Sequence, residues 1–270
     1  MLYIATVHYS SPRWIEIQAA HLRRHIRVPY QTWSSLELID PSYSVHFDRT
    51  VEQFGPHAGK LNHLAREISQ QAADEDLLMF LDGDAFPIAD PMPLIDQSLA
   101  RGALLAVRRA ENFNELQPHP CFCVTTVRTW RALRGDWCAG PTWPGARGKL
   151  TSDVGAILMR RLEVTHTPWV DLLRSNRKNL DPLYFGVYGE VIYHHGAGFR
   201  GGEMSGVHRA LAPARLAGSE LPVLGPALEP VNRARWRRWE AGTQRRHLRQ
   251  SQLIYEKIRR GDPDWLADVM

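Results

Sequence analysis

Residues 76–88 read DLLMFLDGDAFPI, and this stretch decides the fold that the sequence predicts. An apolar run within 76–81 ends abruptly at Asp82, and a helical pattern over 57–73 precedes it. A short apolar run of this kind after a helix is typical of a strand buried on both faces. We therefore expect this strand to lie inside a parallel sheet.

The alternation of strand and helix continues through most of the chain and favours an α/β layered fold. The sequence predicts strands at 2–7, 36–39, 43–47, 76–81, 103–107, 122–125 and 190–193. It predicts helices at 12–25, 57–73, 127–133 and 154–162.

The character of the sequence changes after residue 202. Pro, Ala and Gly dominate up to Pro230, and 231–260 is rich in Arg and Gln with apolar residues between them. We expect an α/β domain at 1–202, followed at 203–270 by an irregular arm and a basic helix that packs on it. Contact of this helix with a second copy, or peripheral docking on an anionic membrane, remains an alternative. No nucleic-acid recognition motif accompanies its basic residues.

The bulk composition is that of an ordinary globular protein. The 270 residues are 44% hydrophobic and 23% charged, and the net charge of +4 is consistent with acidic substrates such as nucleotide diphosphates. The three cysteines, Cys121, Cys123 and Cys138, are too few for a disulfide framework and fit a reducing compartment. No secretory leader or membrane span is evident, so we expect a cytoplasmic protein, with peripheral membrane attachment as the alternative.

Two carboxylates flank a glycine where the buried strand ends. In open α/β sheets, ligands bind outside the carboxyl ends of the strands. Asp82 and Asp84 repel each other unless a cation lies between them, and Mg²⁺ or Mn²⁺ suits such oxygen ligands. Gly83 carries no side chain, so a ligand can approach the backbone there. The alternative is an ordinary solvated turn, because Asp and Gly are common turn residues.

Five segments in this order resemble the GT-A class of nucleotide-sugar-dependent glycosyltransferases. They are LYIATVHYS (2–10), GKLNHLAREI (59–68), FLDGD (80–84, the D-x-D motif), LTSDVGAILMRRL (150–162) and IYHHGAGFR (192–200). The resemblance implies a Rossmann-like, mixed, mostly parallel sheet flanked by helices, with residues 1–202 as the catalytic domain. It also implies transfer of a sugar from a nucleoside-diphosphate sugar, with a UDP-sugar favoured. The acceptor hydroxyl would belong to a saccharide, a lipid-linked molecule or a small molecule.

The resemblance further implies a metal site. Asp84 would bind the cation directly, and Asp82 would hold the cation or the ribose. His194 or His195 would be the third protein ligand. Neighbouring side chains of a strand point to opposite faces, so we expect only one of the two histidines to reach the cation.

The remaining implied roles concern the donor and the acceptor. On the donor side, Thr6, Val7 and His8 would line the base pocket, and Lys60 would lie near the ribose or phosphate. Arg200 would bind the diphosphate, because its guanidinium fork suits phosphate oxygens. On the acceptor side, Asp153 would bind the hydroxyl or act as general base, and Glu190 is a second candidate. The alternative for Asp153 is an N-cap of the helix that follows it.

Two other functions remain open. In haloacid-dehalogenase-like phosphatases the first Asp of a D-x-D motif is a nucleophile, here Asp82, but Phe86 stands where a Thr or Val is usual. The motif also lies farther into the chain than in that class. A non-catalytic nucleotide-sugar-binding module would keep the same fold.

A zinc site is the last alternative. His119, Cys121 and Cys123 alternate, so a regular strand would place them on one face, with Cys138 as a fourth ligand. The spacing is not that of a zinc finger, and buried cysteines more often behave as small apolar residues.

Overall fold

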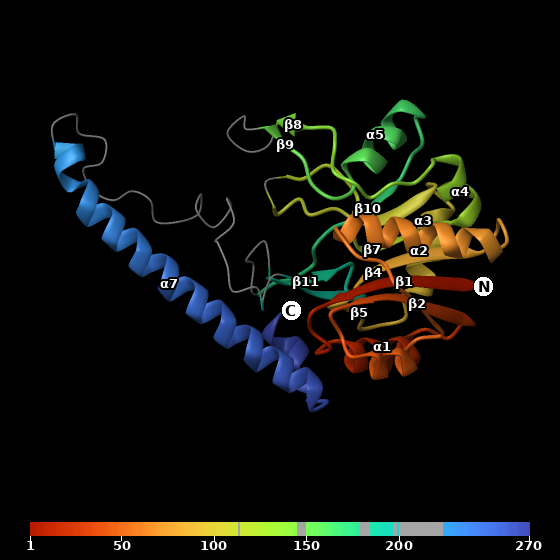
Figure 1. The fold of residues 1–270 in the computed structure, drawn as a ribbon, viewed down its shortest axis with the longest axis horizontal. Coiled ribbons are helices and arrows are strands. Elements are labelled where there is room, and N and C mark those ends of the chain that lie inside the picture. The colour runs from red at the N-terminus through yellow and green to blue at the C-terminus, as the bar shows by residue number, and fades with distance from the viewer. Residues whose placement is uncertain (113, 145–149, 179–183, 197–198, 200–223) are drawn as a thin grey trace. The chain divides into compact units, whose positions relative to one another are not determined.

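The structure is a computed structural model that describes residues 1–112, 114–144, 150–178, 184–196, 199 and 224–270 (Figure 1). The chain divides into two compact units. One comprises Met1–Gly196 with Val269–Met270, and the other comprises Ala197–Asp268.

The centre of the first unit is a seven-stranded sheet. Along the sheet the strands follow the order β10 (Val170–Leu172), β6 (Leu104–Val107), β7 (His119–Thr126), β4 (Leu77–Asp82), β1 (Leu2–Tyr9), β2 (Tyr30–Glu37), β3 (Arg49–Val51). The pairs β10–β6, β4–β1, β1–β2 and β2–β3 are parallel, and β7 is antiparallel to both of its neighbours. The predicted mixed, mostly parallel sheet is therefore confirmed, and it fits the Rossmann-like fold that the resemblance implied.

Helices cover both faces of this sheet, as the apolar character of its strands requires. One core cluster joins the sheet to α2 (His57–Gln71), α4 (Val127–Ala132) and α5 (Ala156–Val164). A second joins the opposite face to α1 (Ile15–His25), α3 (Met92–Leu99) and a smaller sheet.

The smaller sheet is antiparallel, in the order β11 (Tyr184–Tyr188), β12 (Ile192–Gly196), β5 (Ala85–Pro87). Strand β5 begins three residues after β4 ends, so the D-x-D motif forms the link between the two sheets. In the β12–β5 pairing, His194 lies opposite Ala85. A residue more than a hundred positions later is thereby brought beside the motif. A third, two-stranded sheet consists of β8 (Trp143–Pro144) and β9 (Leu150–Thr151).

Three strand predictions are wrong in detail. The strand predicted at 36–39 is the end of β2, which runs from Tyr30 to Glu37 and stops before Leu38, whose φ is 56°. Residues 43–47 fall largely within a 3₁₀ helix, η1 (Pro41–His46), because Asp40 caps it through the Ser42 N–H and Pro41 favours the first turn. The last strand begins at Ile192 instead of Glu190, since Gly189 and Glu190 both have positive φ angles (56° and 60°) and form the turn before it.

The second unit contains the long helix α7 (Leu224–Arg259) and a 3₁₀ helix, η4 (Pro263–Asp268). The predicted basic helix is thus present, and Lys257 is ion-paired to Asp268 at its end (2.7 Å). Its packing on the α/β domain stays a prediction. In the described part of the chain, no helix combines the length and the apolar character needed to cross a bilayer.

Candidate metal centre

The D-x-D turn is held tightly against the ends of two strands. A Cβ atom added at Gly83 would lie 2.4 Å from the Val7 carbonyl oxygen and 2.7 Å from His8 Nδ1. Gln18, from α1, donates through Nε2 to the carbonyl oxygens of Asp82 and Ala85, both at 2.8 Å. The backbone on both sides of the glycine is therefore fixed before any ligand binds.

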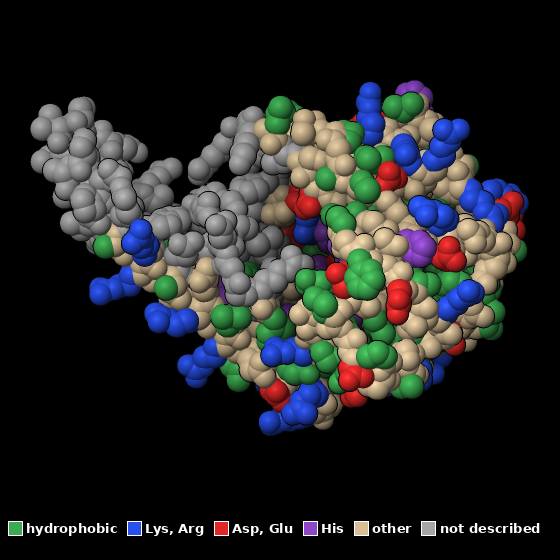
Figure 2. Space-filling view, in the orientation of Figure 1, with side chains coloured by type: hydrophobic (Ala, Val, Ile, Leu, Met, Phe, Trp, Pro, Cys, Tyr) green, Lys and Arg blue, Asp and Glu red, His purple; other side chains and the backbone are tan. Residues whose placement is uncertain are grey.

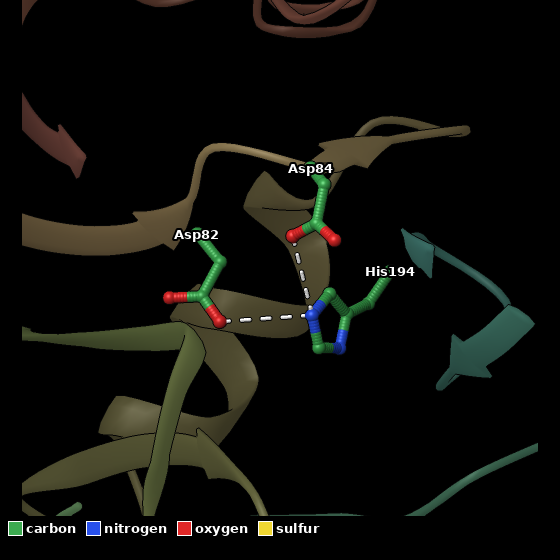
Figure 3. Close-up of side chains that lie close together, drawn as sticks. All are labelled: Asp82, Asp84 and His194. Carbon is green, nitrogen blue, oxygen red and sulfur yellow. Dashed lines mark ion pairs between the residues drawn. The ribbon is translucent and has the colours of Figure 1, made fainter. Parts of the chain in front are cut away.

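Asp82, Asp84 and His194 converge at this turn (Figure 3), and we call these three residues the metal group. His194 Nε2 lies 3.3 Å from Asp84 Oδ1 and 3.6 Å from Asp82 Oδ2. One ligand atom from each residue lies within 4.8 Å of the other two, and no other such group of His, Cys, Asp or Glu occurs among the described residues. Octahedral ligands at about 2.1 Å from a Mg²⁺ ion lie about 3 Å apart, so a small contraction would suffice. Two carboxylates and an imidazole also suit Mn²⁺.

Charge in this group favours a cation. Burial opposes a charge on His194, but Asp84 and Cys121 outweigh it and raise the His194 pKa well above its usual value. Burial likewise tends to raise the pKa of Asp82, yet His57 and His194 outweigh it and lower that pKa. Asp82 thus favours its ionised form, and the raised pKa of His194 shows that positive charge is favoured where the three side chains meet.

His195 lies on the opposite side of strand β12. Its Nδ1 is 2.9 Å from the Tyr193 hydroxyl, and its ring centroid is 4.6 Å from that of Trp14. Burial lowers its pKa to about 3. The geometry places His194, and not His195, beside the carboxylates.

His57 is a neighbour of the metal group that the sequence interpretation missed. Its Nε2 donates to Asp82 Oδ1 at 2.9 Å. The order of elements could have predicted it. Helix α2 precedes β4 and packs on the sheet, so the first residues of α2 lie at the edge where the parallel strands end. His57 is the first residue of that helix.

The three residues predicted to form the base pocket are almost wholly buried. Thr6 is fully buried and donates to Gln18 Oε1 (3.2 Å), and Val7 belongs to the core. His8 Nε2 lies 3.2 Å from the same Gln18 oxygen, and burial lowers the His8 pKa to about 4. These contacts give Thr6 and His8 a role in holding the turn, and their contact with a nucleotide stays a prediction.

Lys60 lies at the same edge of the sheet, but its charge is already matched. Its ammonium group is ion-paired with Glu37 at the end of β2, and it lies 4.8 Å from the ring centroid of Tyr9 at the end of β1. Lys60 is 2% exposed, whereas Tyr9 is 58% exposed. The accessible group at this edge is therefore the Tyr9 ring, which the sequence interpretation did not select.

Asp153 has an unexpected partner. Its Oδ2 accepts from Arg109 Nη2 at 2.8 Å, and the same guanidinium makes a fork with Glu115 at 2.8 and 3.0 Å. The N-cap interpretation of Asp153 is wrong, because Gly155 is the N-cap of α5 and no side chain caps that helix. The carboxylate is half-exposed.

Two other predicted site residues lie elsewhere. Glu190 is exposed in the turn between β11 and β12, four residues before His194, and the structure does not bring it to the metal group. Arg200 lies outside the described residues.

The zinc alternative fails on strand geometry. Ala106 pairs with Cys123, but the next residue, Val107, pairs with His119, so strand β7 bulges between them. The bulge breaks the alternation, and Cys121 and Cys123 belong to core clusters on opposite faces of the sheet.

Comparison with known proteins gives no match to a protein-family model and none to a curated protein. Similar solved structures include the mannosyltransferase PcManGT from Pyrobaculum calidifontis, in complex with GDP-Man and Mn²⁺. It is 12% identical, with a TM-score of 0.38, over 50% of this chain and 46% of that one. TarS 1–349 of S. aureus, in complex with UDP-GlcNAc, is 9% identical, with a TM-score of 0.42, over 66% of this chain and 60% of that one. The glycosyltransferase GlyE of Streptococcus pneumoniae is 13% identical, with a TM-score of 0.35, over 49% of this chain and 36% of that one. The chain therefore spans less than two thirds of each of these three structures.

Proposed function

We propose that the chain is a metal-dependent glycosyltransferase that moves a sugar from a nucleoside-diphosphate sugar to an acceptor hydroxyl. The observation that carries this proposal is the convergence of Asp82, Asp84 and His194 within 4.8 Å at the carboxyl edge of the parallel strands. Substrates bind at this edge in open α/β sheets. UDP-sugars are the favoured donors, and GDP-sugars are the next to test.

In this proposal Asp82, Asp84 and His194 hold Mn²⁺ or Mg²⁺. A bound divalent cation supplies positive charge that stabilises the negative charge developing on the diphosphate leaving group. Gly83 keeps this part of the turn free of a side chain, and Gln18 holds the turn in place. The exposed ring of Tyr9 offers an apolar face for the nucleotide base.

Asp153 is the proposed group on the acceptor side. In a transfer with inversion, its carboxylate accepts the proton that the acceptor hydroxyl loses. The acceptor oxygen bonds to the anomeric carbon as the bond from that carbon to the diphosphate breaks. Arg109 binds Oδ2 of Asp153, and the Val154 N–H donates to Oδ1. The proton would therefore go to the remaining lone pair of Oδ1.

The long helix supports a proposal about partners. Its described exposed residues include six arginines, namely Arg237, Arg238, Arg245, Arg246, Arg249 and Arg259, and Arg260 follows directly after it. Figure 2 shows basic side chains along this helix. We propose that it contacts the catalytic domain or a second copy, with an anionic membrane surface as the alternative. The free thiols of Cys121, Cys123 and Cys138 fit a proposed cytoplasmic location.

The test is a screen of nucleotide-sugars with Mn²⁺ and with Mg²⁺, followed by detection of released nucleoside diphosphate. The proposal expects release from at least one donor, lost when the metal is chelated. Tight binding without any release would indicate a non-catalytic module. A phosphoryl group trapped on Asp82 would indicate a phosphatase.

A further inference from the structure

A second polar cluster lies close to the metal group, organised around Arg109. The Arg109 side chain is 14% exposed and binds Glu115 and Asp153 at the same time. Asn112 also donates to Glu115. The buried guanidinium group of Arg109 is thus shared by two carboxylates. The Glu115 side chain is 12% exposed and the Asp153 side chain is 49% exposed.

Cys121 connects this cluster to the metal group. Its thiol is hydrogen-bonded to His194, and the charges of Asp82 and Arg109 both act on it. The Arg109 cluster therefore lies on the side of the metal group that Cys121 faces. A sugar held at the metal and a molecule held at Asp153 would be neighbours.

Gln117 is the observation that points to a ligand. Its side chain is 1% exposed, and neither its amide oxygen nor its amide nitrogen has a hydrogen-bond partner in the described part of the chain. It packs against the turn that follows Asp153, since its Cγ lies 3.5 Å from the position of a Cβ at Gly155. A buried amide left without partners costs about 1–3 kcal/mol, and such groups call for an explanation.

We infer that Asp153, which Arg109 positions, and Gln117 bind the hydroxyl groups of a saccharide acceptor. This inference rests on the proposed function, because it assigns the residues that bind the acceptor in the same site. A sugar hydroxyl both donates and accepts hydrogen bonds, so it satisfies the carboxylate as well as the amide oxygen and nitrogen. The same amide would gain nothing from an apolar acceptor.

The charge state of the cluster agrees with this assignment. Burial raises the pKa of Glu115 to about 7; Arg109 acts against that rise and Asp153 adds to it. Near neutral pH part of the Glu115 population is therefore uncharged, and in that state Asp153 is the carboxylate that balances the charge of Arg109.

The decisive variant is Gln117→Met, because Met has a similar shape and carries no amide. If Gln117 binds an acceptor, this substitution raises the melting temperature by removing unsatisfied buried polar atoms, yet it weakens acceptor binding about tenfold. Asp153→Asn is expected to weaken acceptor binding to a similar degree. The matched control is Asp171→Asn, which changes another half-exposed aspartate paired with a neighbouring arginine, Arg108.

The measurement is saturation-transfer NMR on the full chain with UDP, and with GDP in parallel, in the presence of the diamagnetic Mg²⁺. The probes are the methyl glycosides of glucose, galactose, mannose and N-acetylglucosamine. We expect the wild type and Asp171→Asn to bind at least one glycoside equally. Gln117→Met and Asp153→Asn should bind that glycoside about tenfold more weakly, while UDP or GDP still binds. Unchanged glycoside binding by Gln117→Met would overturn the inference. Nucleotide binding without any glycoside binding by the wild type would overturn it and leave the proposed function standing. Nucleotide binding that depends on neither Mg²⁺ nor, in a parallel titration, Mn²⁺ would overturn both.

Discussion

His57 Nε2 lies 2.9 Å from Asp82 Oδ1, while the other oxygen of Asp82 lies 3.6 Å from His194 Nε2. The first residue of α2 therefore fixes one oxygen of the carboxylate and turns the other toward the metal group. Partners of this kind set the orientation of metal ligands, and their loss commonly lowers metal affinity.

We expect His57→Ala to weaken Mn²⁺ binding by about tenfold or more, because Asp82 becomes free to rotate. Electron paramagnetic resonance of free and bound Mn²⁺ measures this without any substrate. His57→Gln, which keeps a donor, should restore part of the affinity. His63→Ala, on the same helix, is the control. Equal Mn²⁺ affinity in His57→Ala and the wild type would exclude this role.

Gly83→Ala should destabilise the fold. The added methyl group would meet the Val7 carbonyl oxygen at 2.4 Å, and backbone cannot yield as a flexible side chain can. We expect a loss of about 1–3 kcal/mol in the free energy of unfolding, measured by urea denaturation. Gly59→Ala is the matched control: it lies in α2 with nothing within 4 Å, and it should gain about 0.5–1 kcal/mol. A Gly83→Ala protein as stable as the wild type would show that the turn is not held as described.

The buried His8 predicts a dependence of stability on pH. Burial lowers its pKa from 6.5 to about 4, so between these values the unfolded chain binds more protons than the folded one. The free energy of unfolding must therefore rise with pH across this window, and the His8 contribution is lost as pH falls through about 4. In His8→Gln this part of the rise should vanish. A difference between wild type and variant that stays constant from pH 4 to 6.5 would contradict the assignment.

Lys60 and Glu37 form a buried pair whose members depend on each other. Lys60→Met leaves the Glu37 carboxylate buried without its cation, which should cost about 3–5 kcal/mol in chemical denaturation. The double variant Lys60→Met with Glu37→Gln should recover most of that loss. If the double variant is no more stable than the single one, Lys60 has another role, such as the phosphate contact that its motif suggested.

The parts of the site that the sequence predicted are those with a local pattern. The D-x-D pair follows an apolar run that predicts a strand, and His194 and His195 are adjacent in the sequence, so both motifs can be recognised from neighbouring residues alone. Which of the two histidines faces the carboxylates was not readable, because it depends on the β12–β5 pairing between segments over a hundred residues apart.

The residues that were missed have no pattern of their own. Arg109, Glu115 and Gln117 lie in a loop, and only folding brings them to Asp153 and Gly155. The shared face expected for His119, Cys121 and Cys123 was wrong, because the bulge in β7 cannot be seen in an alternation of residue types. Glu190 was placed in a strand because nothing in the residue type announces its positive φ.

The central claim is that Asp82, Asp84 and His194 hold a cation that binds a nucleoside diphosphate. The most direct test is titration calorimetry of UDP and of GDP with the wild type and Asp84→Ala, each with and without Mn²⁺, using Asp96→Ala on the exposed face of α3 as the control. We expect Mn²⁺ to strengthen nucleotide binding by about a hundredfold in the wild type and the control, and Asp84→Ala to abolish this gain. Equal nucleotide affinity with and without Mn²⁺ in the wild type would contradict it.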